Sequence, residues 1–185
     1  AESGHTEAMR LLIEREADIN DKDCCGRTAL MRAAFSGNEE AVKLLIERKA
    51  DINDKDKIGE TALMYAADSS SVEVVKLLIE KGINIDERNE HGNTALLYAA
   101  KEGNIEIMKL LIEKGANLNE KDSEGNTVLL YALKKGNIEI MKLLIEKGAN
   151  LNEKDSEGNT VLLYALKKGN IEIMKLLIEK GANLN

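Results

Sequence analysis

Apolar side chains recur along the chain in short runs with helical spacing. Residues 87–119 show the pattern most completely. Leu96, Ala99 and Ala100 predict one face of a short first helix, because residues three and four apart share a helix face. The apolar stripe of a second helix is Ile105, Met108, Leu111 and Ile112. Helices this short are marginal in water by themselves, so the pattern predicts helical layers that are stable only when stacked.

The polar and glycine positions of the same segment mark where each helix begins and ends. Gly92 follows a polar run and can adopt the left-handed backbone of a tight turn. Thr94 and Asn104 are the predicted N-caps, since their side-chain oxygens can accept a free backbone N–H one turn on. Gly103 and Gly115 are the predicted stops of the two helices. The segment therefore predicts two short antiparallel helices joined to a projecting loop.

The same pattern repeats every 33 residues through the chain of 185 residues. A partial copy covers 1–20, and five full copies follow it: 21–53, 54–86, 87–119, 120–152 and 153–185. The last two copies are identical, which indicates a tandem duplication. A fixed period of this length is typical of a stacked array, so we expect residues 1–185 to form a single domain.

Each copy carries the pattern DxxGxTALxxAxxxGxxxxxxLLIxxGA with small departures. The pattern begins at Asp23, Asp56, Asn89, Asp122 and Asp155. On these residues the sequence resembles the ankyrin repeats. The resemblance implies an all-α solenoid of helix-turn-helix layers with β-hairpin or loop tips, in five full repeats after an N-terminal partial repeat. It also implies a non-enzymatic module that binds a protein partner through its loop tips and the concave face of its first helices.

Three departures from the glycine columns lie toward the N-terminus. Glu16 and Lys49 stand where later copies carry glycine after the second helix, and Ser70 stands where other copies carry glycine after the first. A non-glycine residue in a left-handed cap costs about 1 kcal/mol. We therefore predict that the N-terminal copies are the less stable end of the array. Hydrogen exchange that is slowest in residues 21–86 would contradict this prediction.

Composition and charge narrow the class of partner. The chain has a net charge of −7 and no basic stripe, which argues against binding to nucleic acid. No apolar run reaches the roughly 18 residues of a membrane helix, so no membrane partner is expected. The adjacent Cys24 and Cys25 predict reduced thiols rather than a disulfide framework. These features favour a cytoplasmic location, with a secreted effector of a host-associated microbe as the alternative.

The residues that could carry catalysis or bind a metal do not gather into a known pattern. By register, His5 and His91 fall nearly three repeats apart, so they do not share a site. His5 aligns with the start of a second helix, which favours a structural role, whereas His91 lies in a loop as a contact residue. Cys24 and Cys25 are adjacent, whereas the first two cysteine ligands of a zinc site usually have two residues between them. We therefore predict no enzyme activity, no catalytic residue, no metal site and no cofactor.

Two residue types recur at the repeat period, and each has two interpretations. The aromatic column is Tyr65, Tyr98, Tyr131 and Tyr164. It forms either a ladder between layers, with its hydroxyls at the wet edge, or a strip that faces a partner, and its regularity favours the ladder. The amide column is Asn20, Asn53, Asn119 and Asn152. It either stabilises the loop, which we favour, or is modified by an asparaginyl hydroxylase, as the resemblance implies for some ankyrin proteins.

The copies differ most at the loop tips and at the adjoining first helices, where the resemblance places partner contacts. The candidate partner-binding residues are Cys24, Cys25, Arg27, Phe35, Lys57, Ile58, Glu60, Asp68, Glu90, His91, Asn93, Lys101 and Glu102. Phe35 and Ile58 are apolar residues on adjacent copies, so we expect them to be exposed and to anchor the contact. The sequence does not identify the protein partner.

Two alternatives to a partner-binding module stay open. One is a structural array that stacks on itself, because the last copy is identical to an interior one and its outer face has no polar capping substitutions. Met174, Leu177 and Ile178 are then expected to be uncovered, which predicts head-to-tail self-association. The other alternative is the scaffold portion of a larger protein whose activity lies in another domain.

Overall fold

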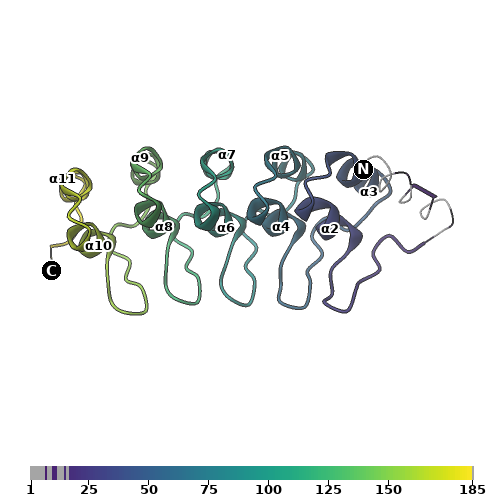
Figure 1. Cartoon of the computed structure of the whole chain (residues 1–185), viewed down its shortest axis with the longest axis horizontal. Coiled ribbons are helices and arrows are strands. Elements are labelled where there is room, and N and C mark those ends of the chain that lie inside the picture. Colours follow the sequence, from purple (N-terminus) through teal and green to yellow (C-terminus); the bar gives the residue numbers. More distant parts are fainter. Residues whose placement is uncertain (1–6, 8–9, 12–14, 16, 185) are drawn as a thin grey trace. The chain divides into compact units, whose positions relative to one another are not determined.

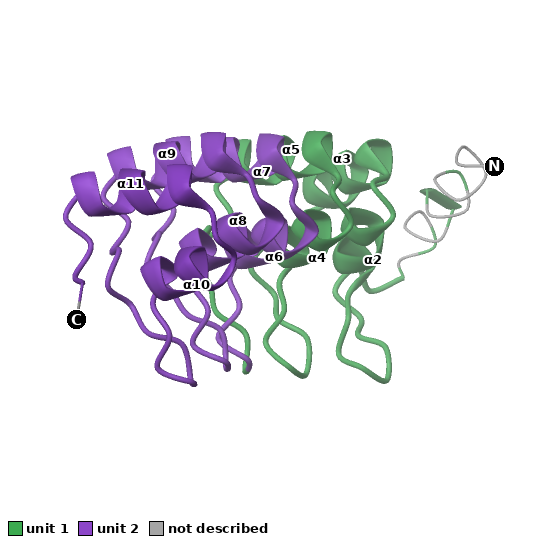
Figure 2. Cartoon of the chain, turned by 60° about the vertical axis from the view of Figure 1, so that its left-hand side comes forward, with its two compact units in different colours: residues 1–90 green, residues 91–185 purple. Residues whose placement is uncertain are grey.

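The computed structural model of the chain describes residues 7, 10–11, 15 and 17–184. These residues form ten α-helices and no strand, so the predicted all-α class is confirmed. The chain divides into two compact units, residues 1–90 and 91–185, and each is described by itself (Figure 2). The single domain expected over residues 1–185 stays a prediction.

The first unit holds two layers of paired helices. The first pair is α2 (Ala29–Phe35) with α3 (Glu39–Glu47), and the second is α4 (Ala62–Asp68) with α5 (Val72–Glu80). Helix α2 packs against α4, and α3 packs against α5. In Figure 1 the connecting loops extend from the side of α2 and α4, away from α3 and α5. The first helices and the loop tips therefore share one side of this unit.

The second unit holds three layers of the same kind. Its first helices are α6 (Ala95–Glu102), α8 (Val128–Lys135) and α10 (Val161–Lys167). Its second helices are α7 (Ile105–Glu113), α9 (Ile138–Glu146) and α11 (Ile171–Glu179). Helix α8 packs between α6 and α10 (Figure 1). No stretch of the described helices combines the length and the low polarity that a bilayer-spanning segment requires.

The helix signals of residues 87–119 are confirmed, with one correction. The Thr94 hydroxyl accepts the N–H of Leu97 at 3.3 Å, and Gly103 ends α6 in the left-handed conformation with φ 79°. Ile105, however, is exposed, and Ile107 is buried in its place. Ile105 is the first residue of α7, and the face that meets the rest of the unit begins two residues later. The predicted apolar stripe was therefore wrong at its first position.

Two of the three non-glycine residues at glycine positions, Lys49 and Ser70, adopt the left-handed conformation that glycine has in the other copies. Lys49 has φ 67° and Ser70 has φ 58°, and among the described residues they are the non-glycine positions with positive φ. Glu16 lies outside the described residues. Both strained caps belong to the first unit, which is consistent with a less stable N-terminal end, although the hydrogen-exchange order itself stays a prediction.

The core of each unit is built mainly from leucine, methionine and alanine. The largest fully buried side chains of the first unit are Leu30, Met31, Leu45, Leu63, Met64 and Leu78. Those of the second unit are Leu96, Leu97, Ile107, Leu111, Leu129 and Leu133. Alanines on the first helices, such as Ala34 and Ala99, are fully buried, and their small side chains let neighbouring helices approach closely.

Candidate functional site

Two neighbouring loop tips of the first unit border an open cavity of about 320 Å³. The residues that line it are Cys24, Cys25, Arg27, Asp56, Lys57, Ile58 and Tyr65. We call the surface formed by these seven residues the tip groove. Five of them are predicted partner-binding residues: Cys24, Cys25, Arg27, Lys57 and Ile58. The structure thus brings together contact candidates that lie about one repeat apart in the sequence.

The backbone of both tips is held in a fixed turn by an aspartate. The Asp56 carboxylate accepts the N–H groups of Ile58 at 3.0 Å and Glu60 at 2.8 Å. The two tips are joined by a hydrogen bond from the N–H of Lys57 to the carbonyl of Cys25 at 3.0 Å. Gly26 makes this approach feasible, since its φ is +83° and a Cβ there would lie 2.8 Å from the Lys57 nitrogen. The groove therefore has a rigid backbone before any partner arrives.

Asp23 organises the charged end of the groove. One carboxylate oxygen accepts the N–H groups of Cys25 and Arg27, at 2.8 and 3.0 Å. The other accepts the side-chain N–H groups of Arg27 and Arg32, both at 2.9 Å. The backbone N–H of Arg27, with help from the other donors, holds the pKa of Asp23 below its ordinary value. Asp23 therefore stays ionised and fixes both guanidinium groups.

Ile58, which lines the groove, and Phe35, which packs on the groove residue Tyr65, are both exposed, as predicted. Phe35 is 51% exposed and Ile58 is 38% exposed. The Phe35 ring meets the Tyr65 ring edge to face, with centroids 6.1 Å apart. Tyr65 donates its hydroxyl hydrogen to Asp56 at 2.8 Å, and burial together with this carboxylate raises the pKa of Tyr65 above its ordinary value. The Tyr65 ring is thus held in place by the hydrogen bond of its hydroxyl to Asp56, while the Phe35 ring remains exposed to solvent.

Comparison with protein-family models gives a match over the whole chain. The model for ankyrin repeats matches residues 1–56, 53–122 and 115–185. The chain belongs to the ankyrin-repeat family. The resemblance inferred from the sequence is thereby confirmed, and ankyrin repeats are generally protein-interaction modules that are typically non-enzymatic. The comparison with curated proteins gave no match.

The tyrosine column of these ankyrin repeats packs between layers, as predicted, but its hydroxyls bind aspartates instead of lying at the wet edge. Tyr131 donates its hydroxyl hydrogen to Asp122 at 2.5 Å, and Tyr164 donates to Asp155 at 2.7 Å. In the second unit, lysine ammonium groups lie 5.4–5.9 Å from the tyrosine ring centroids; these lysines are Lys101, Lys134 and Lys167. Phe35 occupies the lysine column in the first unit. An aromatic edge is therefore exposed there, whereas the second unit presents cations.

The asparagine column stabilises the loops of successive repeats. Asn53 accepts the N–H of Asn84 at 3.0 Å, Asn119 accepts that of Asn150 at 2.8 Å, and Asn152 accepts that of Asn183 at 2.7 Å. A side-chain oxygen that serves a backbone donor in the next repeat has a structural role, which confirms the favoured interpretation of this column.

The other candidate contacts do not line the groove. In the first unit, Glu60 and Asp68 are half-buried, and Glu90 is exposed. In the second unit, His91 and Glu102 are exposed, and Lys101 is half-buried. Asn93 was wrongly placed among them, because it is only 6% exposed and its side-chain oxygen accepts the Lys101 ammonium at 2.6 Å. Its polar side chain is used inside the loop. His5 lies outside the described residues.

Sequence reasoning missed Tyr65 as a residue of the groove. It was assigned to the ladder with the other tyrosines, and it does have that role. The signal lay in the repeat register: Phe35 stands in the column three residues after the tyrosine column, so it meets the tyrosine of the next repeat. A residue that packs between layers can therefore also form the wall of a groove.

Proposed function

We propose that this ankyrin-repeat chain is a non-enzymatic binding module whose protein partner inserts an apolar side chain into the tip groove. The supporting observation is that five predicted contact residues from two adjacent repeats line one cavity, with Phe35 packed on Tyr65 beside it. The proposal also rests on the family, whose members generally bind proteins.

The groove supplies an apolar anchor site with a polar rim. Phe35 and Ile58 offer exposed apolar surface, and aromatic anchors of this kind commonly contribute 2 kcal/mol or more to binding. Arg27 is already paired with Asp23, whereas Lys57, which also lines the groove, forms no salt bridge within the described part of the chain. A partner segment with an acidic residue beside its apolar anchor fits this arrangement. Stable interfaces bury about 1,600 Å² in total, so further loop tips would extend the contact.

Affinity capture with matched isoleucine variants tests this proposal. Ile58 and Ile105 are both 38% exposed, but only Ile58 lines the groove. Ile58→Ser and Phe35→Ser are expected to reduce capture of the partner from the native source at least tenfold, and Ile105→Ser is expected to leave it unchanged. Equal capture by all three variants would place the binding surface elsewhere. Circular dichroism of each variant checks that the fold is retained.

We further propose a cytoplasmic site of action without catalysis or cofactor. The two free thiols, Cys24 and Cys25, are both exposed, which fits a reducing compartment. A secreted effector of a host-associated microbe is the alternative. Localising a tagged chain in the native cell distinguishes the two, since an effector would be recovered outside the cell that makes it.

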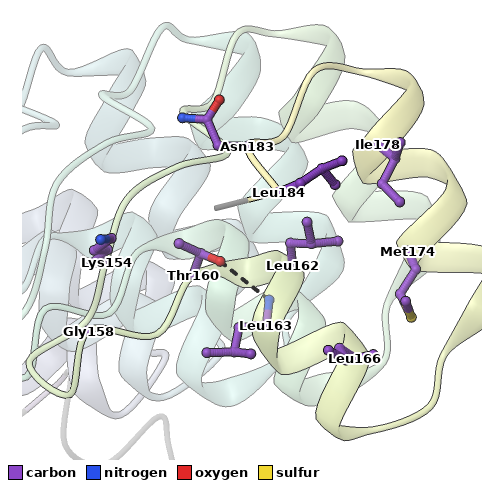
Figure 3. A pocket seen from close by; sticks show the side chains of 10 residues that line it. All are labelled: Lys154, Gly158, Thr160, Leu162, Leu163, Leu166, Met174, Ile178, Asn183 and Leu184. Atoms are coloured by element: carbon purple, nitrogen blue, oxygen red, sulfur yellow. Dashed lines mark hydrogen bonds between the residues drawn. The ribbon is translucent and has the colours of Figure 1, made fainter.

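Self-stacking of the array is a second candidate function, and a cavity on α10 and α11 supports it. The face of α10 and α11 away from α8 and α9 carries an apolar cavity of about 330 Å³ (Figure 3). Its lining includes Leu162, Leu163, Leu166, Met174 and Ile178. Leu177, which was predicted to be uncovered, is fully buried, so that part of the prediction was wrong. Leu177 faces the interior of the layer, and the neighbouring Ile178 faces out.

The occupant we infer for this cavity is a repeat layer of a second molecule, stacked head to tail. The preceding identical copy has the same face, and helix α10 covers it, so the chemistry of the cavity already matches a repeat of this kind. Most of residues 1–20, the partial copy at the other end of the array, lie outside the described residues. Sedimentation velocity over a range of concentrations should show association that Leu166→Lys abolishes. Ile171→Lys, exposed but outside the cavity, should not affect it. A monomeric wild type at high concentration would contradict stacking.

A further inference from the structure

Cys24 and Cys25 form a close pair of thiols at the mouth of the tip groove. Both side chains are exposed, and their sulfur atoms lie 3.9 Å apart. Two thiolates bound to one tetrahedral zinc ion at about 2.3 Å lie about 3.8 Å apart. The two sulfurs therefore lie at the separation that a single tetrahedral cation requires.

A disulfide is a poor alternative fate for this pair. Adjacent Cα atoms across a trans peptide are about 3.8 Å apart, which is shorter than the roughly 4.4–6.8 Å that disulfides usually span. The peptide bonds of the described residues are trans. A bond between these two sulfurs would be strained and readily reduced, so the dithiol form is the one that persists in a reducing compartment.

Asp23 lies beside the thiols but does not serve as a third ligand. Its carboxylate and the two sulfurs have ligand atoms within 4.8 Å of one another. The carboxylate has about four lone-pair sites, and four hydrogen bonds already occupy it: from the N–H groups of Cys25 and Arg27 and from the side chains of Arg27 and Arg32. Coordination by Asp23 would cost at least one of them. The protein ligands are therefore the two sulfurs alone.

The sequence predicted no metal site at these adjacent cysteines, but from the distance between their sulfurs we propose that Cys24 and Cys25 chelate one thiophilic divalent cation of the zinc and cadmium class. As each sulfur–metal bond forms, the thiol releases its proton to solvent, so one cation displaces two protons. A six-coordinate aqua cation that becomes tetrahedral at this site, with two sulfur ligands and two waters, also releases four waters. The two remaining tetrahedral positions hold water and face solvent. This open chelate differs from a closed structural zinc site, which the spacing of the cysteines excludes. It also stands independently of the partner proposed for the groove.

Residues at equivalent positions of other repeats indicate which substitutions the loop should accept without loss of the fold. Ser123 and Ser156 occupy the position of Cys24 in later repeats, and Asn89 occupies the position of Asp23. Cys24→Ser and Asp23→Asn therefore introduce residues that this loop already accommodates elsewhere in the chain. Cys25→Ser changes an exposed side chain. Each single cysteine variant also serves as the lone-thiol control for the other.

Titration of the reduced 185-residue chain with Cd²⁺, followed by thiolate-to-cadmium charge-transfer absorption, tests the site. We expect saturation at one ion per chain, release of two protons, and competition by Zn²⁺. Cys24→Ser and Cys25→Ser should each weaken binding at least tenfold, because chelation is lost, and Asp23→Asn should change it less than threefold. Undiminished binding by either cysteine variant, or two ions per wild-type chain, would overturn the chelate. A loss with Asp23→Asn equal to that of the cysteine variants would overturn the assignment of two sulfur ligands.

Discussion

The copies 120–152 and 153–185 have the same sequence and helices that match to within one residue, yet they do not have the same interior. Leu133 in the first of them is 1% exposed, and its counterpart Leu166 is 57% exposed. The difference arises because α10 covers the face of α8, whereas within the described residues nothing covers the same face of α10. The pair teaches that local sequence specifies the helices and their caps, while the neighbouring layer decides which residues become core.

The largest expected effect is the difference in stability loss between alanine variants of Leu133 and Leu166. Leu133→Ala should lower the free energy of unfolding by about 3 kcal/mol, because it leaves a cavity between layers. Leu166→Ala should change it by less than about 0.5 kcal/mol, since the side chain is mostly in water already. Urea unfolding of the full chain, followed by circular dichroism, measures both. Equal losses would show that the outer face of α10 is covered in solution.

Replacing the turn glycines Gly125 and Gly158 with alanine should lower stability by unequal amounts, and the difference should be smaller than that between the two leucine variants. Gly125 and Gly158 have φ +77° and +81°, so alanine costs about 1 kcal/mol of backbone strain at either position. At Gly125 the new Cβ would also lie 2.9 Å from the backbone of Asp155 and Ser156, whereas at Gly158 nothing lies within 4 Å. We therefore expect Gly125→Ala to cost about 2–3 kcal/mol and Gly158→Ala about 1 kcal/mol in thermal or urea unfolding. Equal losses of stability for the two variants would mean that the backbone of Asp155 and Ser156 moves to accommodate the new Cβ at position 125.

The aspartates that open these repeats should make the second unit sensitive to acid. Burial opposes ionisation of Asp122, but hydrogen bonds from Tyr131 and Asn126 outweigh it, and the pKa of Asp122 lies below its ordinary value. Its stabilisation is therefore complete above the unfolded pKa of about 4 and is lost as the pH falls through the lower folded pKa. Asp122→Asn should cost about 1 kcal/mol at pH 7, because the Tyr131 hydroxyl loses its charged acceptor.

The same substitution should reduce the dependence of stability on pH below about pH 4. Unfolding of wild type and variant at pH 7 and near pH 3 measures this change. Asp155→Asn, in the identical copy, should have the same sign, because the pKa of Asp155 is also lowered. An Asp122→Asn variant whose stability falls as steeply in acid as that of wild type would show that other carboxylates dominate.

The smallest expected effect concerns the lysines that lie over the tyrosine ladder. The Lys134 ammonium lies 5.5 Å from the Tyr131 centroid and 5.4 Å from the Tyr164 centroid, whereas Lys167 lies over Tyr164 alone, at 5.6 Å. Each exposed cation–π contact contributes about 0.5 kcal/mol. Lys134→Met should therefore cost about 1 kcal/mol and Lys167→Met about half as much, measured by thermal unfolding. A larger cost at Lys167 would contradict the interleaved arrangement.

Much of the fold and part of the candidate site could be predicted from the sequence. The caps at Thr94 and Asn104, the strained positions at Lys49 and Ser70, and the exposure of Phe35 and Ile58 all followed from the repeat register. These features depend on a few neighbouring residues or on a column that recurs. Such local rules are more reliable in a repeat protein, because the same residue type recurs at the same position of several copies.

The failures concern side chains whose partners lie outside the local pattern. Asn93 belongs to a variable column and so resembled a contact residue, but its side chain bonds to Lys101 eight positions later. Leu177 lies in an apolar run whose outward and inward members cannot be distinguished without the adjoining layer. Tyr65 became part of a groove only because the loop carrying Cys25 lies beside that carrying Lys57.

The sequence by itself determined the family, the 33-residue period and the helices of this protein, because these depend on short-range periodicity and caps that act within one copy. The tertiary structure decided which of two identical leucines is core. It also decided which loop tips meet in a groove and that two adjacent sulfurs lie at chelating distance. The physical reason is that burial, grooves and side-chain geometry depend on what lies across a layer, and a residue's own repeat does not contain that information.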